Sequence, residues 1–312
     1  MFRIINYEKN LNKNIQSSAL TGWAFLGGNE MRKNKSKKLL EQLNNRIDSV
    51  RESEEFKSML QFLGEFHNYS YQNSILIQMQ RPDASYVAGY KQWQKKFNRH
   101  VKKGEKAISI LAPFTYKKRV AEEKKIDGQL KEVEKEVKRI YFRPVNVFDV
   151  SQTEGDPLPN LDISVSDDYS RLYKPLAHYT KFKNITLTLK VLSESLKGYS
   201  RGGKILINKI LNQTERSGVL VHELGHELLH QKCGSKLSKE VKEMEAEAAA
   251  FVVMDHYGVD IKSDKYLALY KESYDLKQSL KRIDNLASEI INYCDDYLIK
   301  NKENDKKLKE VV

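Results

Sequence analysis

The 312-residue sequence has little cysteine and proline and no long apolar run. Its two cysteines, Cys233 and Cys294, are too few and too isolated for a disulfide framework or a cysteine-ligated metal cluster, which fits a reducing compartment. No stretch approaches the roughly 20 apolar residues that span a bilayer. The most apolar N-terminal piece, residues 19–28, is too short and too glycine-broken for a signal peptide. These absences predict a cytoplasmic protein without a membrane segment.

Acidic residues are in the minority, because 42 Asp and Glu stand against 54 Lys and Arg, which gives a net charge of +12. Residues 1–150 contain 29 Lys and Arg against 17 Asp and Glu, whereas residues 151–312 contain 25 of each. All the excess positive charge therefore lies in the first half. A basic half joined to a neutral half indicates that one domain meets a polyanion while the other has a different task.

The length predicts about two domains. We place the first at residues 31–150 and the second at residues 166–300, with a Gly- and Pro-containing linker at 151–165 and a solvated tail at 301–312. Residues 1–30 have no clear period. We expect them to be a misassigned start or a dispensable extension, because the codons of Gly27 and Gly28 can form a bacterial ribosome-binding site just before Met31.

Periodicity predicts the elements of both halves. In the first half we expect two amphipathic helices between Lys35 and Phe66, a short aromatic and basic helix at 89–97, strands at 107–113 and 139–150, and a solvated Lys/Glu-rich hairpin at 117–139 that turns at Asp127 and Gly128. In the second half we expect strands at 185–192 and 203–208, and helices at 214–230, 238–258 and 266–298.

The stretch VHELGHELLH, residues 221–230, contains the zinc-protease signature His-Glu-x-x-His in two overlapping frames. The first frame is His222, Glu223 and His226, and the second begins at His226 and ends at His230. We favour the first, because the apolar residues before it root the ligands in the core and Gly225 permits close approach of another backbone. His230 lies near the helix end, where an imidazole interacts favourably with the helix dipole.

Histidines four apart on a helix offer two imidazoles on one face, and Glu223 stands beside them to take a proton from water. The third ligand should come from the next helix, where Glu243, Glu245 and Glu247 alternate. Glu243 and Glu247 share a face, so one can bind Zn²⁺ while the other accepts the N–H of a ligand histidine. We assign Glu243 as the ligand and Glu247 as its outer partner, with the exchange left open, and expect Glu245 to face solvent. A purely structural zinc site usually has Cys or His in its fourth position, and the sequence offers no evident candidate.

The basic half combines cations with flat side chains, as binding of single-stranded nucleic acid requires. The candidates for this binding are Tyr86, Tyr90, Lys91, Trp93, Lys95, Lys96, Arg99, Lys102, Lys103 and Lys106. Phe97 is a further ring in the series. The alternative for Tyr90, Trp93 and Phe97 is burial in the core at helical spacing.

The run HNYSYQNSILIQMQRPDASYVAGYKQWQKKFNRHVKKGEKAISILAP, residues 67–113, together with VNVFDVSQTEGDPLP, resembles the N-terminal single-stranded-DNA-binding domain of ArdC-type antirestriction proteins of plasmids and conjugative elements. GGKILIN, VHELGHELLH and KEMEAEAAAFVV resemble the zincin-like half found with it and in ImmA/IrrE metallopeptidases. The resemblance covers roughly residues 35–300. It implies an α+β DNA-binding domain followed by a minimal gluzincin-like domain, with His222, His226 and a Glu of EMEAE on zinc and Glu223 as catalytic carboxylate. Many of these relatives have a Gly near Asn98.

We therefore expect an antirestriction-type protein of a mobile element that binds single-stranded DNA, with double-stranded DNA left open, and that carries a zinc metallopeptidase acting on an unknown protein. One alternative is a non-proteolytic DNA-protecting protein with a scaffold zinc site, and another is a peptidase that cleaves a repressor. The strand GGKILIN is our candidate for an edge that holds an extended substrate. Tyr199, His256 and Tyr257 are candidate oxyanion donors.

Overall fold

The computed structural model describes residues 26–49, 53–126, 129–158, 170–231, 237–259 and 275–309. The chain divides into two compact units, of which unit 1 is Met1–Asn44 with Val87–Gly155 and unit 2 is Asn45–Tyr86 with Asp156–Val312. Both helices and strands are present, as an α+β protein requires. Among the described residues, no helix combines the length and apolar character that crossing a bilayer needs.

Unit 1 is built on an antiparallel sheet in the order β1-β4-β3, formed by β1 (Val87–Gly89), β4 (Gln129–Asp149) and β3 (Ile108–Ile126). Helix α5 (Tyr90–Phe97) follows β1, as the sequence predicts. It packs by Trp93, which is fully buried and donates its indole N–H to the Phe148 carbonyl at 2.9 Å. Asn98 ends the helix in the left-handed conformation, with φ of 50°. Asparagine tolerates this region better than most residues, so it provides the turn without a glycine.

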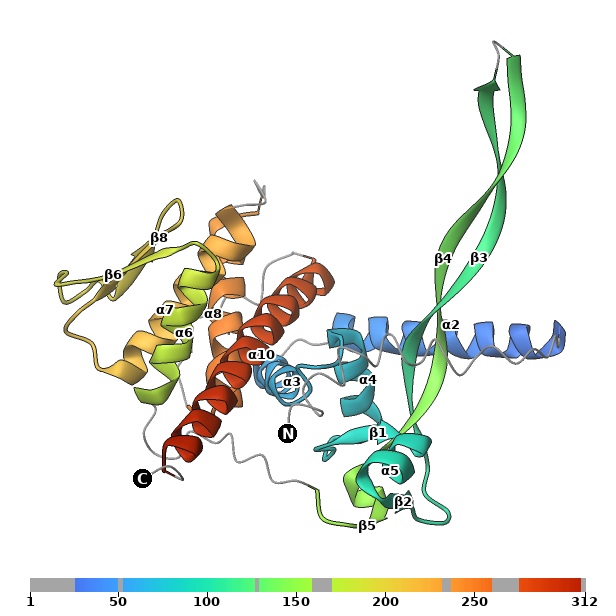
Figure 1. Ribbon diagram of the computed structural model, residues 1–312, viewed down its shortest axis with the longest axis horizontal. Helices are drawn as coiled ribbons and strands as arrows, with labels where there is room; N and C mark the ends of the chain where they lie inside the picture. Colours follow the sequence, from blue (N-terminus) through green and yellow to red (C-terminus); the bar gives the residue numbers. More distant parts are fainter. Residues whose placement is uncertain are drawn as a thin grey trace. The chain divides into compact units, whose positions relative to one another are not determined.

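The β3–β4 hairpin continues well beyond β1, which pairs only with Val147–Asp149 of β4 (Figure 1). Its register runs from Ile108 opposite Val147 to Ile126 opposite Gln129. The predicted Lys/Glu-rich hairpin is thus confirmed, and its described outer side chains are mostly exposed. The expected turn at Asp127 and Gly128 lies outside the described residues.

The first part of the predicted linker 151–165 is regular structure. After the 3-10 turn Val150–Gln152, strand β5 (Thr153–Gly155) pairs antiparallel with β2 (Arg99–Val101). Gly155 has φ of 137°, and a Cβ there would lie 2.4 Å from the Asn98 carbonyl oxygen, so only glycine fits. A glycine that reads as a breaker in the sequence is thus required here by a close strand contact. Residues 159–169 are not described.

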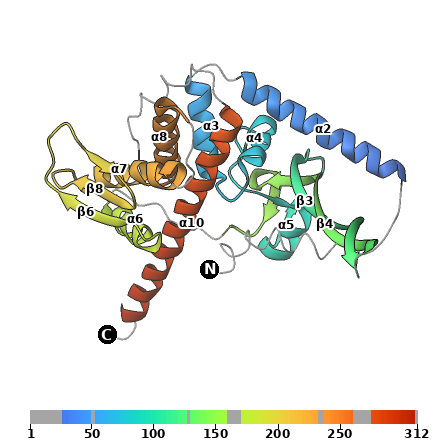
Figure 2. The same ribbon diagram turned by 90° about the horizontal axis from the view of Figure 1, so that it is seen from above.

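Unit 2 contains a helical core of α3 (Ser53–Glu65), α8 (Lys239–His256) and α10 (Leu276–Lys309), with α4 (Tyr71–Gln80) beside α10 (Figure 2). The buried apolar face of α3 is the one that the periodicity predicts: Phe56, Met59, Leu60 and Leu63 are all buried. Burial of each such side chain stabilises the fold by about 1.5–3 kcal/mol.

Residues 45–86 group with unit 2, and the sequence places them in a domain of residues 31–150. The physical reason is packing across the sequence. A Cβ on Gly64 would lie 3.0 Å from the Val252 carbonyl oxygen of α8, and the Tyr71 backbone N–H donates to Asp284 of α10 at 3.0 Å. An apolar helical stripe does not indicate which distant helix will cover it.

Unit 2 also contains a three-stranded sheet in the order β6-β8-β7, with β6 (Thr186–Lys190) parallel and β7 (Gly198–Ser200) antiparallel to β8 (Lys204–Asn208). It contacts α6 (Ser170–Phe182) and α7 (Gln213–Gly225) (Figure 1). The strand GGKILIN is central and paired on both sides. The expectation that it offers an edge is therefore wrong, and β7 is the edge nearest α7.

The ends of the chain differ in part from the predicted segments. Residues 1–25 of the expected extension are not described, and residues 26–30 begin helix α2 (Leu26–Ser49). The predicted helix 266–298 is α10 from Leu276 onward, and residues 260–274 are outside the description. The helix runs through most of the predicted tail, to Lys309.

Candidate functional site

Helix α7 presents the metal-binding motif on a buried element. Its N-terminus is capped by Asn212, whose side chain accepts the Glu215 N–H while Glu215 accepts the Asn212 N–H. Leu220, Val221 and Leu224 are fully buried and fix the helix in the core of unit 2. From His226 to Gln231 the backbone changes to a π-helical turn. Such turns are uncommon and occur frequently at functional sites.

Helices α7 and α8 meet at Gly225, as the sequence predicts for a close approach of two backbones. A Cβ at Gly225 would lie 2.8 Å from the Cα of Ala246. The side chain of Ser238 caps α8 by accepting the Val241 N–H. Together these features fix the glutamates of α8 against the histidines of α7.

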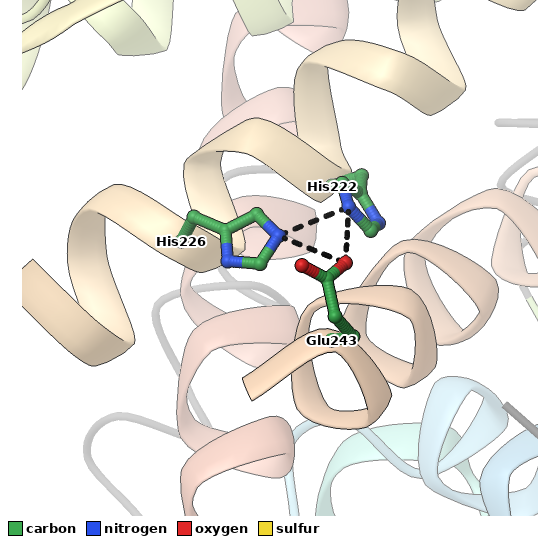
Figure 3. Close-up of side chains that lie close together, drawn as sticks. All are labelled: His222, His226 and Glu243. Atoms are coloured by element: carbon green, nitrogen blue, oxygen red, sulfur yellow. Dashed lines mark hydrogen bonds and ion pairs between the residues drawn. The ribbon is translucent and has the colours of Figure 1, made fainter. Parts of the chain in front are cut away.

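The structure brings together His222, His226 and Glu243, with one ligand atom of each within 4.8 Å of the others (Figure 3). The Nε2 atoms of the two histidines are 3.1 Å apart, and Glu243 Oε2 is 3.6 Å from His222 Nε2 and 3.5 Å from His226 Nε2. All three side chains are partly exposed, so water can reach the group.

Glu247 lies on the other side of His222 and accepts its Nδ1–H at 2.8 Å. A carboxylate only accepts, so this bond sets the proton on Nδ1 and turns Nε2 toward His226 and Glu243. The arrangement places Glu243 with the ligand atoms and Glu247 behind them.

The charges of the site are strongly coupled. Burial opposes protonation of His222, but hydrogen bonds to Glu243 and Glu247 outweigh it and raise its pKa to about 9. The hydrogen bond from His222 lowers the pKa of Glu243 to about 2. Burial and the charge of His222 lower the pKa of His226 to about 4. Near neutral pH, a protonated His222 therefore donates to a neutral His226 beside an ionised Glu243.

Glu223 stands next to the histidines and is only 7% exposed. Burial raises the pKa of its carboxyl and outweighs the charge of His222 and a hydrogen bond from Ser200, both of which lower it. Ser200 lies on the edge strand β7, and a Cβ on Gly198 of that strand would lie 3.6 Å from Glu223 Cγ. A carboxylate with a raised pKa is suited to accept and return a proton.

The second frame of the motif serves the structure of the site. Glu227 is buried and accepts the Gly203 backbone N–H at 2.9 Å, which fastens the β7–β8 turn to the helix. His230 is buried and donates Nε2–H to Glu245 at 3.1 Å. His230 thus lies in the last helical turn, as the sequence predicts, with its side chain buried against α8.

The expectation that Glu245 faces solvent is wrong. Its carboxylate is fully buried and accepts from His230, from the Ser279 hydroxyl at 2.6 Å and from the Arg282 guanidinium. These hydrogen bonds outweigh burial and lower its pKa. Its partners come from the π-helical turn and from α10, neither of which the spacing of the three glutamates could indicate.

None of the three candidate oxyanion donors is placed for that role. Ser200 faces Glu223, so the strand alternation turns its neighbour Tyr199 to the opposite face of the sheet. His256 and Tyr257 lie at the far end of α8, where they bond the Gly64 carbonyl and Asp295 respectively. Both side chains hold helices together.

The predicted DNA-binding residues divide by burial. Tyr90 is exposed, as are Lys91, Lys95, Lys96, Lys102, Lys103 and Lys106. Trp93 is buried in the core, which is the alternative to DNA binding that its helical spacing left open. Phe97 is half-buried beside it, with 5.2 Å between the ring centroids. Arg99 bonds Thr153 and the Gly155 carbonyl, so it holds β5. Tyr86 is grouped with unit 2.

Residues 29–148 match the N-terminal domain of anti-restriction factor ArdC. An ArdC-type N-terminal domain is therefore present in the first half of the chain.

Uncharacterized protein pXO2-81 of Bacillus anthracis is 29% identical over an alignment that covers 81% of this chain and 51% of that protein, so the chain spans about half the length of this relative. The metal-free crystal structure of antirestriction protein ArdC from plasmid R388 aligns at 17% identity and a TM-score of 0.38, over 75% of this chain and 85% of that one. The Mn(II)-bound structure aligns at 15% and 0.39, over 72% and 83%.

Proposed function

We propose that this chain is an antirestriction-type protein of a mobile element that binds single-stranded DNA through unit 1 and hydrolyses peptide bonds at a zinc centre in unit 2. The observation that carries the peptidase is the convergence of His222, His226 and Glu243 on one point, with the buried carboxylate of Glu223 beside it.

The donor set fits Zn²⁺, which is commonly held in catalytic sites by two imidazoles and a carboxylate with a fourth position for water. The hydrogen bond from His222 to Glu247 supports this assignment, because ligand histidines usually give their second N–H to a carboxylate. A bound zinc ion would lower the pKa of water and polarise a substrate carbonyl.

Glu223 would take a proton from water as the water attacks the scissile carbonyl, and would then return it to the leaving amine. Strand β7 is suited to hold the substrate. Among the described strands it pairs with β8 alone, and Ser200 ties it to Glu223. An extended peptide adding to this edge would run past the carboxylate.

For DNA, the exposed lysines of and after α5 support binding along the phosphate backbone, with a strong dependence on salt. The match of residues 29–148 to the ArdC N-terminal domain supports the antirestriction role. Two alternative functions would use the same DNA-binding unit and metal site. One is a DNA-protecting protein whose metal site is a scaffold, and the other is a peptidase that cleaves a repressor.

Glu223→Gln tests the peptidase. We expect unchanged zinc content and oligonucleotide affinity but loss of cleavage of denatured fluorescent casein, measured with and without oligo-dT. The matched control is Glu215→Gln on the same helix, because glutamine also serves in the capping box. Cleavage that persists in Glu223→Gln contradicts the mechanism, whereas wild-type protein that never cleaves supports the scaffold alternative.

A further inference from the structure

The β3–β4 hairpin carries aromatic side chains where a globular protein usually has polar ones. Tyr116 is 46% exposed, Tyr141 43% and Phe142 55%. Beyond the three residues paired with β1, this part of the hairpin is a two-stranded ribbon, since the described residues provide no third strand. Two-stranded ribbons are marginally stable in water, so exposed rings on one need a reason.

One face of the ribbon holds an ordered series of rings. Phe114 pairs with Tyr141 in the register, and Tyr116 pairs with Arg139, so their side chains share a face. The ring centroids of Phe114 and Tyr141 are 5.8 Å apart, and those of Tyr141 and Tyr116 are 5.6 Å apart. We call Phe114, Tyr141 and Tyr116 the aromatic ladder, in which Phe114 is the buried inner ring and Tyr141 and Tyr116 are the exposed rings.

Arginines stand at both ends of the aromatic ladder. The Arg143 guanidinium carbon lies 3.3 Å from the centroid of Phe114, and Arg139 is exposed opposite Tyr116. The nearby ion pair of Lys117 with Glu136 belongs to the other face of the ribbon, because both residues alternate with the ladder positions. The ladder face therefore combines rings with positive charge.

We propose that the exposed rings of the aromatic ladder, Tyr141 and Tyr116, are a stacking surface for the bases of single-stranded DNA, with Arg139 and Arg143 beside the phosphates. Exposed rings give any base a flat partner, and neighbouring cations attract the backbone, which together are the requirements for binding single strands without sequence preference. A protein partner would be expected to meet a more apolar, less charged surface. The inference rests on the proposed function and adds a contact separate from the lysines near α5.

The test is the affinity of fluorescein-labelled dT oligonucleotides of about 20 nucleotides, measured by anisotropy over a range of salt. The variant Tyr116→Ala with Tyr141→Ala should raise Kd by about 10-fold or more with an unchanged salt slope, since stacking releases no counterions. Tyr116→Phe with Tyr141→Phe keeps both rings and should bind like wild type. Arg139→Ala should lower the salt slope by about 1.

Two single variants are the controls: Phe142→Ala, on the opposite face of the same hairpin, and Tyr199→Ala, an exposed tyrosine of unit 2. Both should bind like wild type. If wild-type protein does not bind the oligonucleotide, the proposed function fails. If wild type binds and the double alanine variant binds equally well, the ladder inference alone fails. Base stacking is also overturned if Phe142→Ala weakens oligonucleotide binding as much as the double alanine variant does. It is likewise overturned if the double alanine variant weakens binding of duplex DNA to the same extent.

Discussion

His222 Nδ1 lies 2.8 Å from Glu247 Oε2, on the side of the ring away from the group of ligand atoms. Glu243, one turn earlier on α8, instead approaches Nε2 of both histidines. Two glutamates on one helix face thus have different environments. One completes the set of ligand atoms, and the other fixes the orientation and tautomer of a histidine.

Replacing each of these glutamates with glutamine should separate the two roles. Glu243→Gln removes an anionic ligand, and we expect the loss of stoichiometric zinc. Glu247→Gln keeps an acceptor for the His222 N–H but loses its charge, so zinc affinity should fall by about 10- to 100-fold. Competition with a chromophoric chelator measures both affinities. A larger loss in Glu247→Gln than in Glu243→Gln would reverse the assignment.

Metal binding should release a proton at neutral pH. The raised pKa of His222, about 9, means that the metal-free protein holds a proton there which a metal must displace, whereas His226, with a pKa of about 4, is already neutral. Affinity should therefore rise about tenfold per pH unit from pH 5 to 8 and level off above about pH 9. Calorimetry in buffers of different ionisation enthalpy counts the protons. Release of none at pH 7 contradicts this protonation state.

Much of the site could be predicted because its residues follow local rules. The spacing of four places His222 with His226 and Glu243 with Glu247, and the caps and Gly225 set the helices that carry them. Glu245 could not be predicted in the same way. Its partners Ser279 and Arg282 are 34 and 37 residues away, and only the packed fold brings them to it.

The same limit applies to how the helices group and to the order of the strands. Helices between Lys35 and Phe66 follow from their apolar period, but the unit that covers them depends on contacts with α8 and α10. The strand GGKILIN is evident from alternation, yet its central place depends on the three-residue strand β7, which is too short to give a pattern.

Breaking the bond between Arg282 and Glu245 should destabilise unit 2. Arg282→Met leaves a fully buried carboxylate without its cationic partner, and we expect the free energy of unfolding to fall by about 3–5 kcal/mol. Glu245→Gln combined with Arg282→Met should recover part of this loss, because no buried charge remains. Urea unfolding followed by circular dichroism measures both.

The control for Arg282→Met is Lys277→Met on the same helix. Lys277 pairs with Asp48 at 3.1 Å in an exposed position, where ion pairs contribute about 0–1 kcal/mol. Similar losses in the two variants would mean that the buried network contributes no more than a surface pair.

Asp284 should make unit 2 less stable as pH rises. Burial raises its pKa from 3.8 to about 7, against the hydrogen bond that it accepts from the Tyr71 N–H. The folded state then holds a proton that the unfolded chain loses near pH 4, so stability falls between about pH 4 and pH 7 and is level above. Asp284→Asn keeps the acceptor without the charge. Its free energy of unfolding should therefore exceed that of wild type by an amount that grows across this range to at most about 4 kcal/mol. Thermal unfolding from pH 4 to 8 measures it, with the exposed Asp275→Asn as control for the substitution. An advantage that does not change with pH would show that Asp284 is not protonated in the folded protein.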